Sequence, residues 1–370
     1  MRPTHGIHIA ALDHLRAFAA LLVIAWHVAH TSVHCAGICS GSQLPQTWPW
    51  LAWIEQGHTG VSLFLVLSGY VFAHLTEGKE LRVLPFWRNR LLRLMPLLAF
   101  WMIVNGLGDA WRHGSFSLSA FLDDPAGAWT VFLELRYYLL LPLLLWLGRR
   151  LGPYWAVFAI LGLIGWRYEI WRHHGSVQYA AYWTLVGRLD QFLLGGLFFA
   201  LQRRFPSATR WRWAGGLALL TLWACYGAFA RGGGAWPGNN SPSAWWVILP
   251  TLDGLAYGAL IVAYASLPLR GRLGDAFGAL GRWSYSLYLN HFAVIGLLLP
   301  FAARWIPFPE GLLSRLAYAG VLLMPPVVVL SALSYRWIEC PWLGLRRPYL
   351  RPVAPVAAGP RRDAAMVATG

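Results

Sequence analysis

Apolar runs long enough to cross a lipid bilayer recur along this chain of 370 residues, from Leu12 to Ile338. A membrane-spanning helix needs roughly 20 mainly apolar residues, and it satisfies its backbone hydrogen bonds within one segment, as lipid requires. The pattern therefore predicts an all-α polytopic membrane protein, with about ten transmembrane helices bundled around a polar cavity. The predicted spans are residues 12–34, 60–76, 94–108, 128–147, 153–170, 181–201, 213–229, 245–266, 281–300 and 312–338.

The composition excludes an ordinary soluble domain. Hydrophobic residues make up 57% of the chain and charged residues 12%, and the mean hydropathy is +0.48. A soluble domain would carry about 25% charged residues. The 23 tryptophans and 15 tyrosines gather near the ends of the apolar runs, which is typical of the aromatic belts at membrane interfaces.

The formal net charge of +15 follows the predicted topology. If the N-terminus lies in the cytoplasm, the segments on that side hold 21 basic residues and the outer loops hold 5. Because basic loops stay in the cytoplasm, we expect both termini there, in a multi-pass protein of the cytoplasmic (inner) membrane. The lipid bilayer is the expected environment, and no nucleic-acid partner is expected. The cytoplasmic charge also offers a docking surface for anionic lipid or a phosphorylated ligand.

The chain is expected to divide into a membrane domain, residues 1–341, and a basic cytoplasmic tail rich in proline and alanine, residues 342–370. The composition predicts disorder from Arg346 onward. In the first outer loop, Cys35 and Cys39 lie four residues apart. An oxidising compartment favours a disulfide between them, and two free thiols are the alternative.

Two ionisable residues stand inside the first apolar run. Arg16 and His27 are separated by eleven helical steps of roughly 100°, so they face one side of the helix, about 16 Å apart along its axis. Asp13 lies three residues before Arg16, on the same face. Ionisable groups in a membrane helix usually face a polar cavity, which makes this pair a candidate site. The alternative is an arginine that reaches the interface and a histidine bonded to a neighbouring helix.

Arg90 and Arg93 stand at the cytoplasmic start of the third span. Their i, i+3 spacing puts both guanidinium groups on one side of a helix. Paired arginines suit phosphate groups, which they bind through charge-assisted, bidentate hydrogen bonds. The alternative is that both residues serve only the membrane topology.

Further polar residues are embedded in the apolar runs. Any one of them is explained by an ion pair or hydrogen bond that holds two helices together, whereas several together indicate a shared polar cavity. Ser68 lacks the surroundings of a nucleophile elbow and fits tight helix packing better. These residues are Ser68, Glu134, Arg136, Arg188, Asp190, Tyr285 and His291.

In order along the chain, these blocks resemble the integral-membrane acyltransferase-3 family, whose members are carbohydrate O-acyltransferases. The similarity runs from Leu12 to about Pro341. Arg16 and His27 match an Arg-x10-His signature, and Arg90 and Arg93 match Arg-x-x-Arg. The other blocks are Gly60-Val-Ser-Leu-Phe-Leu-Val-Leu-Ser-Gly-Tyr70, Trp129 with Glu134, Gly281-Arg-Trp-Ser-Tyr-Ser-Leu-Tyr-Leu-Asn-His291 and Ser334-Tyr-Arg-Trp-Ile-Glu339-Cys-Pro341.

Two positions depart from the family pattern. Arg136 replaces a neutral residue in what is expected to be a polar site, where it would alter the choice of acceptor. Cys340 stands where arginine is common before the proline.

The resemblance implies a function and a set of roles. Acyl-coenzyme A, most commonly acetyl-CoA, supplies the acyl group from the cytoplasm as a substrate, and no permanently bound cofactor or metal is expected. The acceptor is a sugar hydroxyl of a cell-envelope or exported polysaccharide, including a lipid-linked one, and glycan-assembly proteins are expected partners. His27 acts as general base or as an acyl carrier, with Arg16 and Glu134 assisting it, and Arg90 and Arg93 bind the donor. Supporting residues are Asp13, Ser68, Arg136, Arg188, Tyr285, His291 and Glu339.

Two other classes compete with this interpretation. A transporter or flippase for lipid-linked glycan would also need a polar path through the membrane. Such proteins carry related halves, which the sequence does not display. A haem protein would need two ligands at similar depth on facing helices, and His291 is the one mid-span partner for the first-span histidines.

Overall fold

The computed structural model describes residues 10–32, 35–38, 52–114, 127–234, 240–267 and 271–352. Most of this length is helical. The long helices are α1 (Ala10–His30), α3 (Gly60–Thr76), α4 (Val83–His113), α6 (Trp129–Leu151), α7 (Trp155–His174), α9 (Leu185–Arg204), α10 (Ala208–Phe229), α11 (Trp245–Ala265) and α13 (Ser284–Ala302). The last apolar run is one continuous helical segment with two π-helical turns: α14 (Leu312–Tyr318), η5 (Ala319–Leu323), α15 (Met324–Ser334), η6 (Tyr335–Glu339) and α16 (Cys340–Leu343).

Each of the ten predicted spans coincides with one of these long helical segments. Within the described residues, eight of the segments are long and apolar enough to cross a membrane. The other two, α7 and α9, have 20 residues each and carry embedded charges. The chain is thus an all-α polytopic membrane protein, while a count of ten spans stays a prediction.

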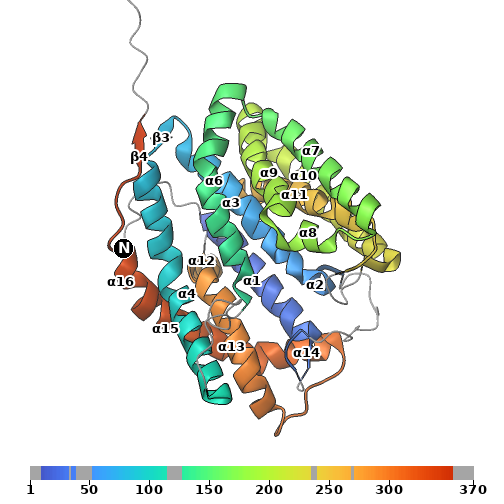
Figure 1. Ribbon diagram of the computed structural model, residues 1–370, viewed down its shortest axis with the longest axis vertical. Coiled ribbons are helices and arrows are strands. Elements are labelled where there is room, and N and C mark those ends of the chain that lie inside the picture. The colour runs from blue at the N-terminus through green and yellow to red at the C-terminus, as the bar shows by residue number, and fades with distance from the viewer. Residues whose placement is uncertain are drawn as a thin grey trace, which may run out of the picture.

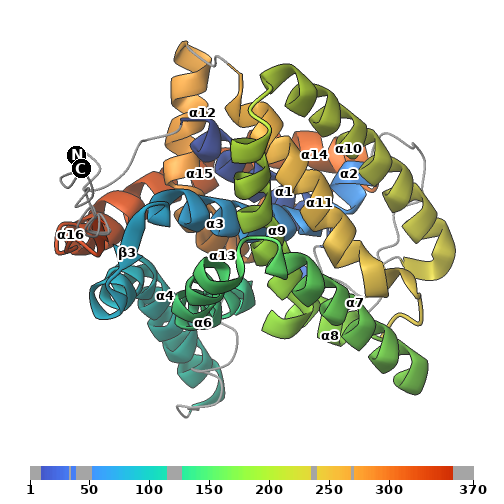
Figure 2. The same ribbon diagram turned by 90° about the horizontal axis from the view of Figure 1, so that it is seen from above.

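The most buried helices form the centre of the bundle. Figures 1 and 2 both show α1, α3, α9 and α11 in the middle, with α4 and α6 on one side and α7 and α10 on the other. Most residues of α1, α3 and α11 are buried, whereas fewer than a third of the residues are buried in the apolar stretches of α4, α6 and α10. The apolar surface of the outer helices is what a lipid-facing layer requires.

Glycines allow the central helices to approach each other closely. A Cβ atom on Gly69 of α3 would lie 2.0 Å from the carbonyl oxygen of Phe192 in α9, and one on Gly195 of α9 would lie 2.1 Å from that of Val66. A Cβ atom on Gly60 would similarly meet the carbonyl oxygen of Ala19 in α1 at 2.5 Å. Small residues at helix interfaces are the usual means of close packing in membranes, so the small-residue block in the second span serves packing.

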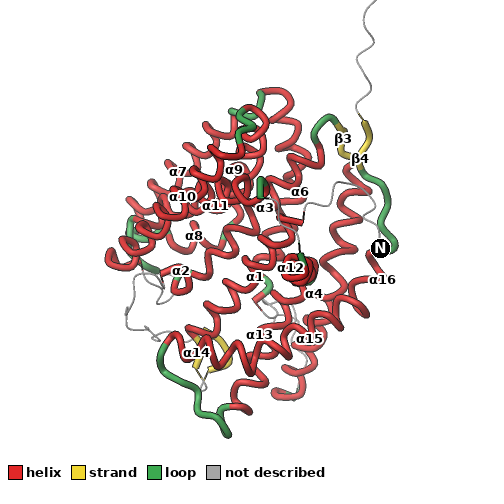
Figure 3. Tube along the Cα trace, turned by 180° about the vertical axis from the view of Figure 1, so that it is seen from behind, coloured by secondary structure: helices red, strands yellow, loops and turns green. Residues whose placement is uncertain are grey.

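Short elements complete the fold. Two antiparallel two-stranded sheets pair β1 (Thr31–Ser32) with β2 (Cys35–Ile38) and β3 (Lys79–Leu81) with β4 (Leu350–Pro352) (Figure 3). The short helices are α2 (Ala52–Glu55), η2 (Gly57–Thr59), α8 (Gln178–Trp183) and α12 (Arg272–Arg282), and a π-helical turn, η4 (Ala230–Gly234), follows α10. Cys39 lies outside the described residues, so the predicted disulfide with Cys35 stays a prediction.

The prediction of disorder from Arg346 onward is wrong as far as Pro352. Strand β4 pairs with β3, and Tyr349 is buried. The side chain of Asn89 in α4 donates a hydrogen bond of 2.7 Å to the carbonyl oxygen of Arg347 and accepts one of 3.0 Å from its amide. Composition misled the prediction because these contacts come from partners more than 250 positions away. Residues 353–370 lie outside the described residues.

A buried charge cluster joins α7, α9 and α11. Arg167 donates to the carboxylate of Asp190 at 2.8 Å and to Thr251 at 2.6 Å, and neither charged side chain is exposed. Nearby, Arg188 donates to Ser62 at 2.9 Å, and Ser62 donates to Asp253 at 3.0 Å. Arg167 can be fully buried because Asp190 compensates its charge.

Candidate active site

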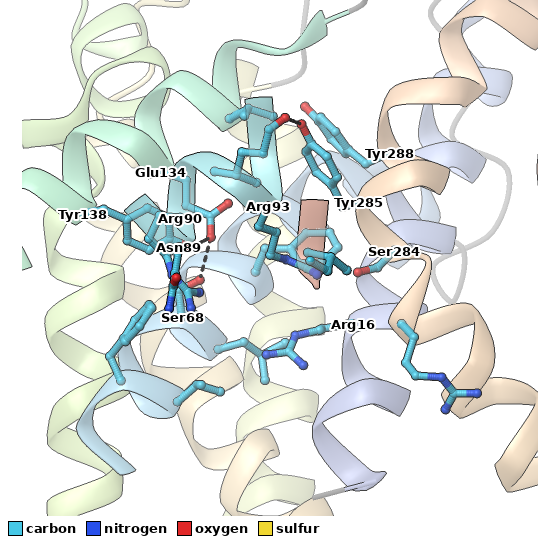
Figure 4. Close-up of a pocket in the computed structure, with 18 of the residues that line it drawn as sticks. Arg16, Ser68, Asn89, Arg90, Arg93, Glu134, Tyr138, Ser284, Tyr285 and Tyr288 are labelled. Atoms are coloured by element: carbon cyan, nitrogen blue, oxygen red, sulfur yellow. Dashed lines mark hydrogen bonds between the residues drawn. The ribbon is translucent and has the colours of Figure 1, made fainter. Parts of the chain in front are cut away.

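A cavity of about 660 Å³ opens between α1, α3, α4, α6 and α13, with the segment after α16, which leads into the β3–β4 sheet, also in its wall. Figure 4 shows Arg90, Arg93 and Glu134 toward one side and Ser284, Tyr285 and Tyr288 toward the other, with Arg16 below them in that view. Six arginines and two carboxylates line the cavity, so it carries an excess of positive charge. These charged residues are Asp13, Arg16, Arg90, Arg93, Glu134, Arg282, Arg346 and Arg347.

Arg90 is held by aromatic rings rather than by an acid. Its guanidinium carbon lies 5.4–5.7 Å from the centroids of four rings, those of Phe72, Phe86, Tyr138 and Tyr349. Ring faces attract a cation without neutralising it. Its Nε atom is buried and has no hydrogen-bond partner among the described residues. The charge of Arg90 is therefore fixed in place and still available to an anion.

Arg93 lies one turn further along α4 and also lines the cavity. It makes no ion pair with any described residue. Arg16, by contrast, donates to the carboxylate of Asp13 at 2.8 Å. The structure thus brings the predicted donor residues and Arg16 into one cavity, with Arg16 already paired.

Glu134 is half-buried in the wall of the same cavity. Its Oε1 atom accepts a hydrogen bond from Tyr138, and Ser68 of α3 donates to the same atom at 3.5 Å (Figure 4). The carboxylate thus keeps its second oxygen for another donor, such as a substrate hydroxyl. Ser68, interpreted from the sequence as a packing residue, also contributes a hydroxyl to the cavity.

His27 does not line this cavity and instead pairs with His291 of α13. The Nδ1 atom of His27 lies 2.8 Å from the carbonyl oxygen of Val23, and Nδ1 of His291 lies 3.3 Å from that of Leu287. Carbonyl oxygens only accept, so in the neutral imidazoles both Nδ1 atoms carry the proton. His291 Nε2, 3.3 Å from His27 Nδ1, is then an acceptor. This arrangement leaves a lone pair on Nε2 of His27, as a general base requires.

Tyr288 links the cavity to the histidine pair, because it lines the cavity and packs against His291. Its ring centroid is 5.8 Å from that of His291, and its hydroxyl donates to the carbonyl oxygen of Gly127 at 2.9 Å. His291 is fully buried, whereas His27 is half-buried. The ring centroids of His27 and His291 are 4.9 Å apart, and the nearest ring nitrogens are 3.3 Å apart, which leaves no space for a haem between them. His27 thus lies outside the arginine-lined cavity.

The remaining predicted residues are spread over the molecule. Tyr285 lines the cavity and donates to the carbonyl oxygen of Leu94. Glu339, on the π-helical turn η6, is fully buried and accepts a hydrogen bond from Ser286.

Two of the residues predicted to lie in the polar site do not lie there. Arg136 is exposed on the outside of α6, because it is two residues from Glu134 and the two cannot share a helix face. Arg188 belongs to the buried cluster with Ser62 and Asp253.

Sequence reasoning missed Asn89, Arg346 and Tyr349, which also line the cavity. The available signal was the run Arg346-Arg347 directly after the last span, which was attributed to topology and to a disordered tail.

The acyltransferase domain of the acyltransferase-3 family matches residues 9–336 of the chain. The chain belongs to this family. The acyltransferase MdmB of Streptomyces mycarofaciens is 25% identical over 94% of this chain and 95% of its own length. The O-acetyltransferase OatA of Staphylococcus aureus is 24% identical over 90% of this chain and 57% of its own length. No solved structure is significantly similar to the chain.

Family membership identifies the protein as an acyltransferase of the membrane, which favours group transfer over transport. In this acyltransferase the matched region contains the cavity residues on α1, α3, α4, α6 and α13. It ends at Arg336, before the segment that contributes Arg346 and Tyr349.

Proposed function

We propose that this acyltransferase moves an acyl group, acetyl by default, from cytoplasmic acyl-coenzyme A to a hydroxyl group of a cell-envelope or exported polysaccharide. The observation that carries the proposal is the arginine-lined cavity, one of whose lining residues, Tyr288, packs against a histidine pair with a free lone pair. The arginines suit the phosphates of the donor. The histidine suits the proton of the acceptor hydroxyl.

The transfer step follows from this arrangement. Nε2 of His27 takes the proton of the acceptor hydroxyl while the oxygen attacks the thioester carbonyl carbon. The carbon–oxygen bond forms, the carbon–sulfur bond breaks, and the coenzyme A thiolate takes the proton back from the imidazolium. The hydrogen bonds to Val23 and His291 hold the ring in the tautomer that this step needs. His27 is half-buried. An acceptor that approaches the exposed part of its side chain would reach the ring from the side opposite the donor.

Arg16 and Glu134 take separate parts in this scheme. Arg16 lies about 16 Å from His27 along α1, so it acts on the donor within the cavity rather than on the oxygen that develops charge beside His27. Glu134 lies in the same cavity and orients the donor arm or an acceptor hydroxyl through its second carboxylate oxygen. Bridging the two ends requires an extended donor arm, as coenzyme A has.

The transfer itself can be measured with the purified, reconstituted protein and acetyl-CoA labelled in the acetyl group. We expect label in an envelope glycan fraction and stoichiometric release of free coenzyme A. Mass spectrometry of glycans from a deletion strain, compared with wild type, should show the loss of the same acyl mass. Glycans with identical acylation in both strains, and no release of coenzyme A, would refute the proposal.

Arg93→Gln should weaken donor binding about tenfold or more. A charge-assisted hydrogen bond contributes about 1.5–3 kcal/mol, and about 1.4 kcal/mol corresponds to one decade in affinity. Titration calorimetry with coenzyme A measures the change. Arg82→Gln is the control, because Arg82 is exposed directly before α4 and does not line the cavity. Equal affinities for both variants would mean that the donor pocket lies elsewhere.

The proposed donor route requires the β3–β4 end of the molecule to face the cytoplasm. In a cysteine-free background, Arg82→Cys should be protected from an impermeant maleimide on intact cells and become labelled after permeabilisation. Arg231→Cys, at the opposite end of its span and also exposed, should be labelled on intact cells. Labelling in the reverse order would place the arginine-lined cavity on the outer side and remove the route for a cytoplasmic donor.

A further inference from the structure

Arg346 reaches the arginine-lined cavity from a part of the chain that follows the last membrane helix. It lies three residues after the end of α16 and lines the same cavity as Arg90 and Arg93. Its Nε and Nη2 atoms are buried and find no hydrogen-bond partner within the described part of the chain. Buried donors without an acceptor cost free energy, and more so when they are charged. Arg346 is therefore arranged for an acceptor that its own surroundings do not supply.

The backbone around Arg346 is fixed on both sides of the residue. Asn89 holds the amide and the carbonyl of Arg347 with two hydrogen bonds. Strand β4 pairs with β3 a few residues later, with Leu81 opposite Leu350. Between these contacts Tyr349 is buried, with its ring centroid 5.7 Å from that of Phe86. Arg346 thus belongs to an ordered segment of the cavity wall, whose backbone is held by hydrogen bonds on both sides.

Positive charges predominate around Arg346. Burial, together with the charges of Arg93 and Arg90, lowers the pKa of Arg346 to about 10. The group still carries its charge at neutral pH. Glu339 is a carboxylate within the field of Arg93 and Arg346, and one of its oxygens is bonded to Ser286. One carboxylate does not balance three guanidinium groups.

We propose that Arg346 is a third phosphate-binding arginine of the donor site, carried to Arg90 and Arg93 by the segment that follows the last membrane helix. The inference rests on the proposed function, since coenzyme A is taken to be the phosphate-bearing ligand. The headgroup of an anionic phospholipid offers the same chemistry, and the experiment below separates the two sources.

The test compares two variants that lose the same charge from the same segment. Arg346→Gln removes the cavity arginine, whereas Arg351→Gln removes an exposed arginine of β4 that does not line the cavity. Coenzyme A is titrated into each protein in a neutral detergent without lipid. We expect the dissociation constant of Arg346→Gln to rise about tenfold or more, with Arg346→Lys in between, because lysine keeps the charge and loses the bidentate geometry. Arg351→Gln should bind as the wild type does.

Melting temperatures without ligand distinguish phosphate binding from a structural role. If Arg346 serves the ligand, its removal relieves repulsion from Arg90 and Arg93, so Arg346→Gln should melt at or above the wild-type temperature. Coenzyme A should then raise its melting temperature less than that of the wild type, as weaker binding requires. If Arg346 instead exists to pair with Glu339, the variant should melt at a lower temperature without ligand, and that result would overturn the inference.

The remaining outcomes separate this inference from the proposed function. In one outcome, wild type binds coenzyme A, Arg93→Gln binds it more weakly, and Arg346→Gln binds it as wild type does. The inference then falls and the proposed function stands. If wild type binds no coenzyme A, the proposed donor falls, and the inference with it. Binding in nanodiscs tests the lipid as the source of the phosphate. If Arg346→Gln loses the preference for phosphatidylglycerol over phosphatidylcholine but keeps its affinity for coenzyme A, the arginine binds lipid and the inference is overturned.

Discussion

His27→Ala is expected to lower acyl transfer by a factor of about 10²–10⁴, the usual contribution of a positioned general base. The reason is the tautomer that Val23 and His291 impose, which leaves Nε2 of His27 as the proton acceptor. Turnover of labelled acetyl-CoA by the purified variant measures the effect. Coenzyme A affinity should stay within about twofold of wild type, because His27 does not line the cavity.

A matched variant excludes a general effect of losing a histidine. His74 is half-buried on α3, and it neither lines the cavity nor contacts the histidine pair. His74→Ala should keep wild-type turnover. Should His27→Ala keep near wild-type turnover while folded, the base of the reaction must be another group, and Glu134 is then the first candidate within the cavity.

Arg167→Met is expected to destabilise the folded protein by about 3–5 kcal/mol, because it leaves the buried carboxylate of Asp190 without its partner. The pair is 2.8 Å apart and both side chains are fully buried. Thermal denaturation in detergent, followed by the fraction of monodisperse protein, measures the loss. The double variant Arg167→Met with Asp190→Leu should recover most of it, since it removes both charges together.

A second ion pair on the same helix provides the comparison. Arg172 and Glu169 are 3.3 Å apart, and more than half of each side chain is exposed. Arg172→Met should therefore cost no more than about 1 kcal/mol. Equal losses for the two variants would show that the buried pair does not depend on charge compensation.

Local periodicity predicted the parts of the site that lie on one helix. The spacing of Arg90 and Arg93 places both in one cavity. Such relations depend only on the spacing of residues around one helix, which can be read from the sequence. Arg16 lines the cavity, whereas His27 on the same helix lies outside it and contacts His291 of α13, so the functional pairing of Arg16 with His27 stays a prediction.

Relations between helices were beyond the reach of the sequence. His27 and His291 are 264 positions apart, and the sequence offered His291 as a mid-span partner without showing that α1 and α13 are neighbours. Arg136 and Arg188 resemble site residues by type, yet one faces outward from α6 and the other joins the cluster with Asp253. Their places follow from which helices are neighbours, and the choice of neighbours is set by close contacts such as those at Gly69 and Gly195.

The hydrogen bonds between Asn89 and Arg347 also have a consequence for biosynthesis. The two residues are 258 positions apart, and at about 5–20 residues per second the ribosome needs roughly 13–52 s to pass from one to the other. For most of that interval α4 is already made, while the segment that carries Arg346 does not yet exist. A nascent chain therefore contains all its membrane helices before it contains the complete set of cavity arginines. Quality control that monitors membrane insertion alone would pass chains that stop short of Arg346.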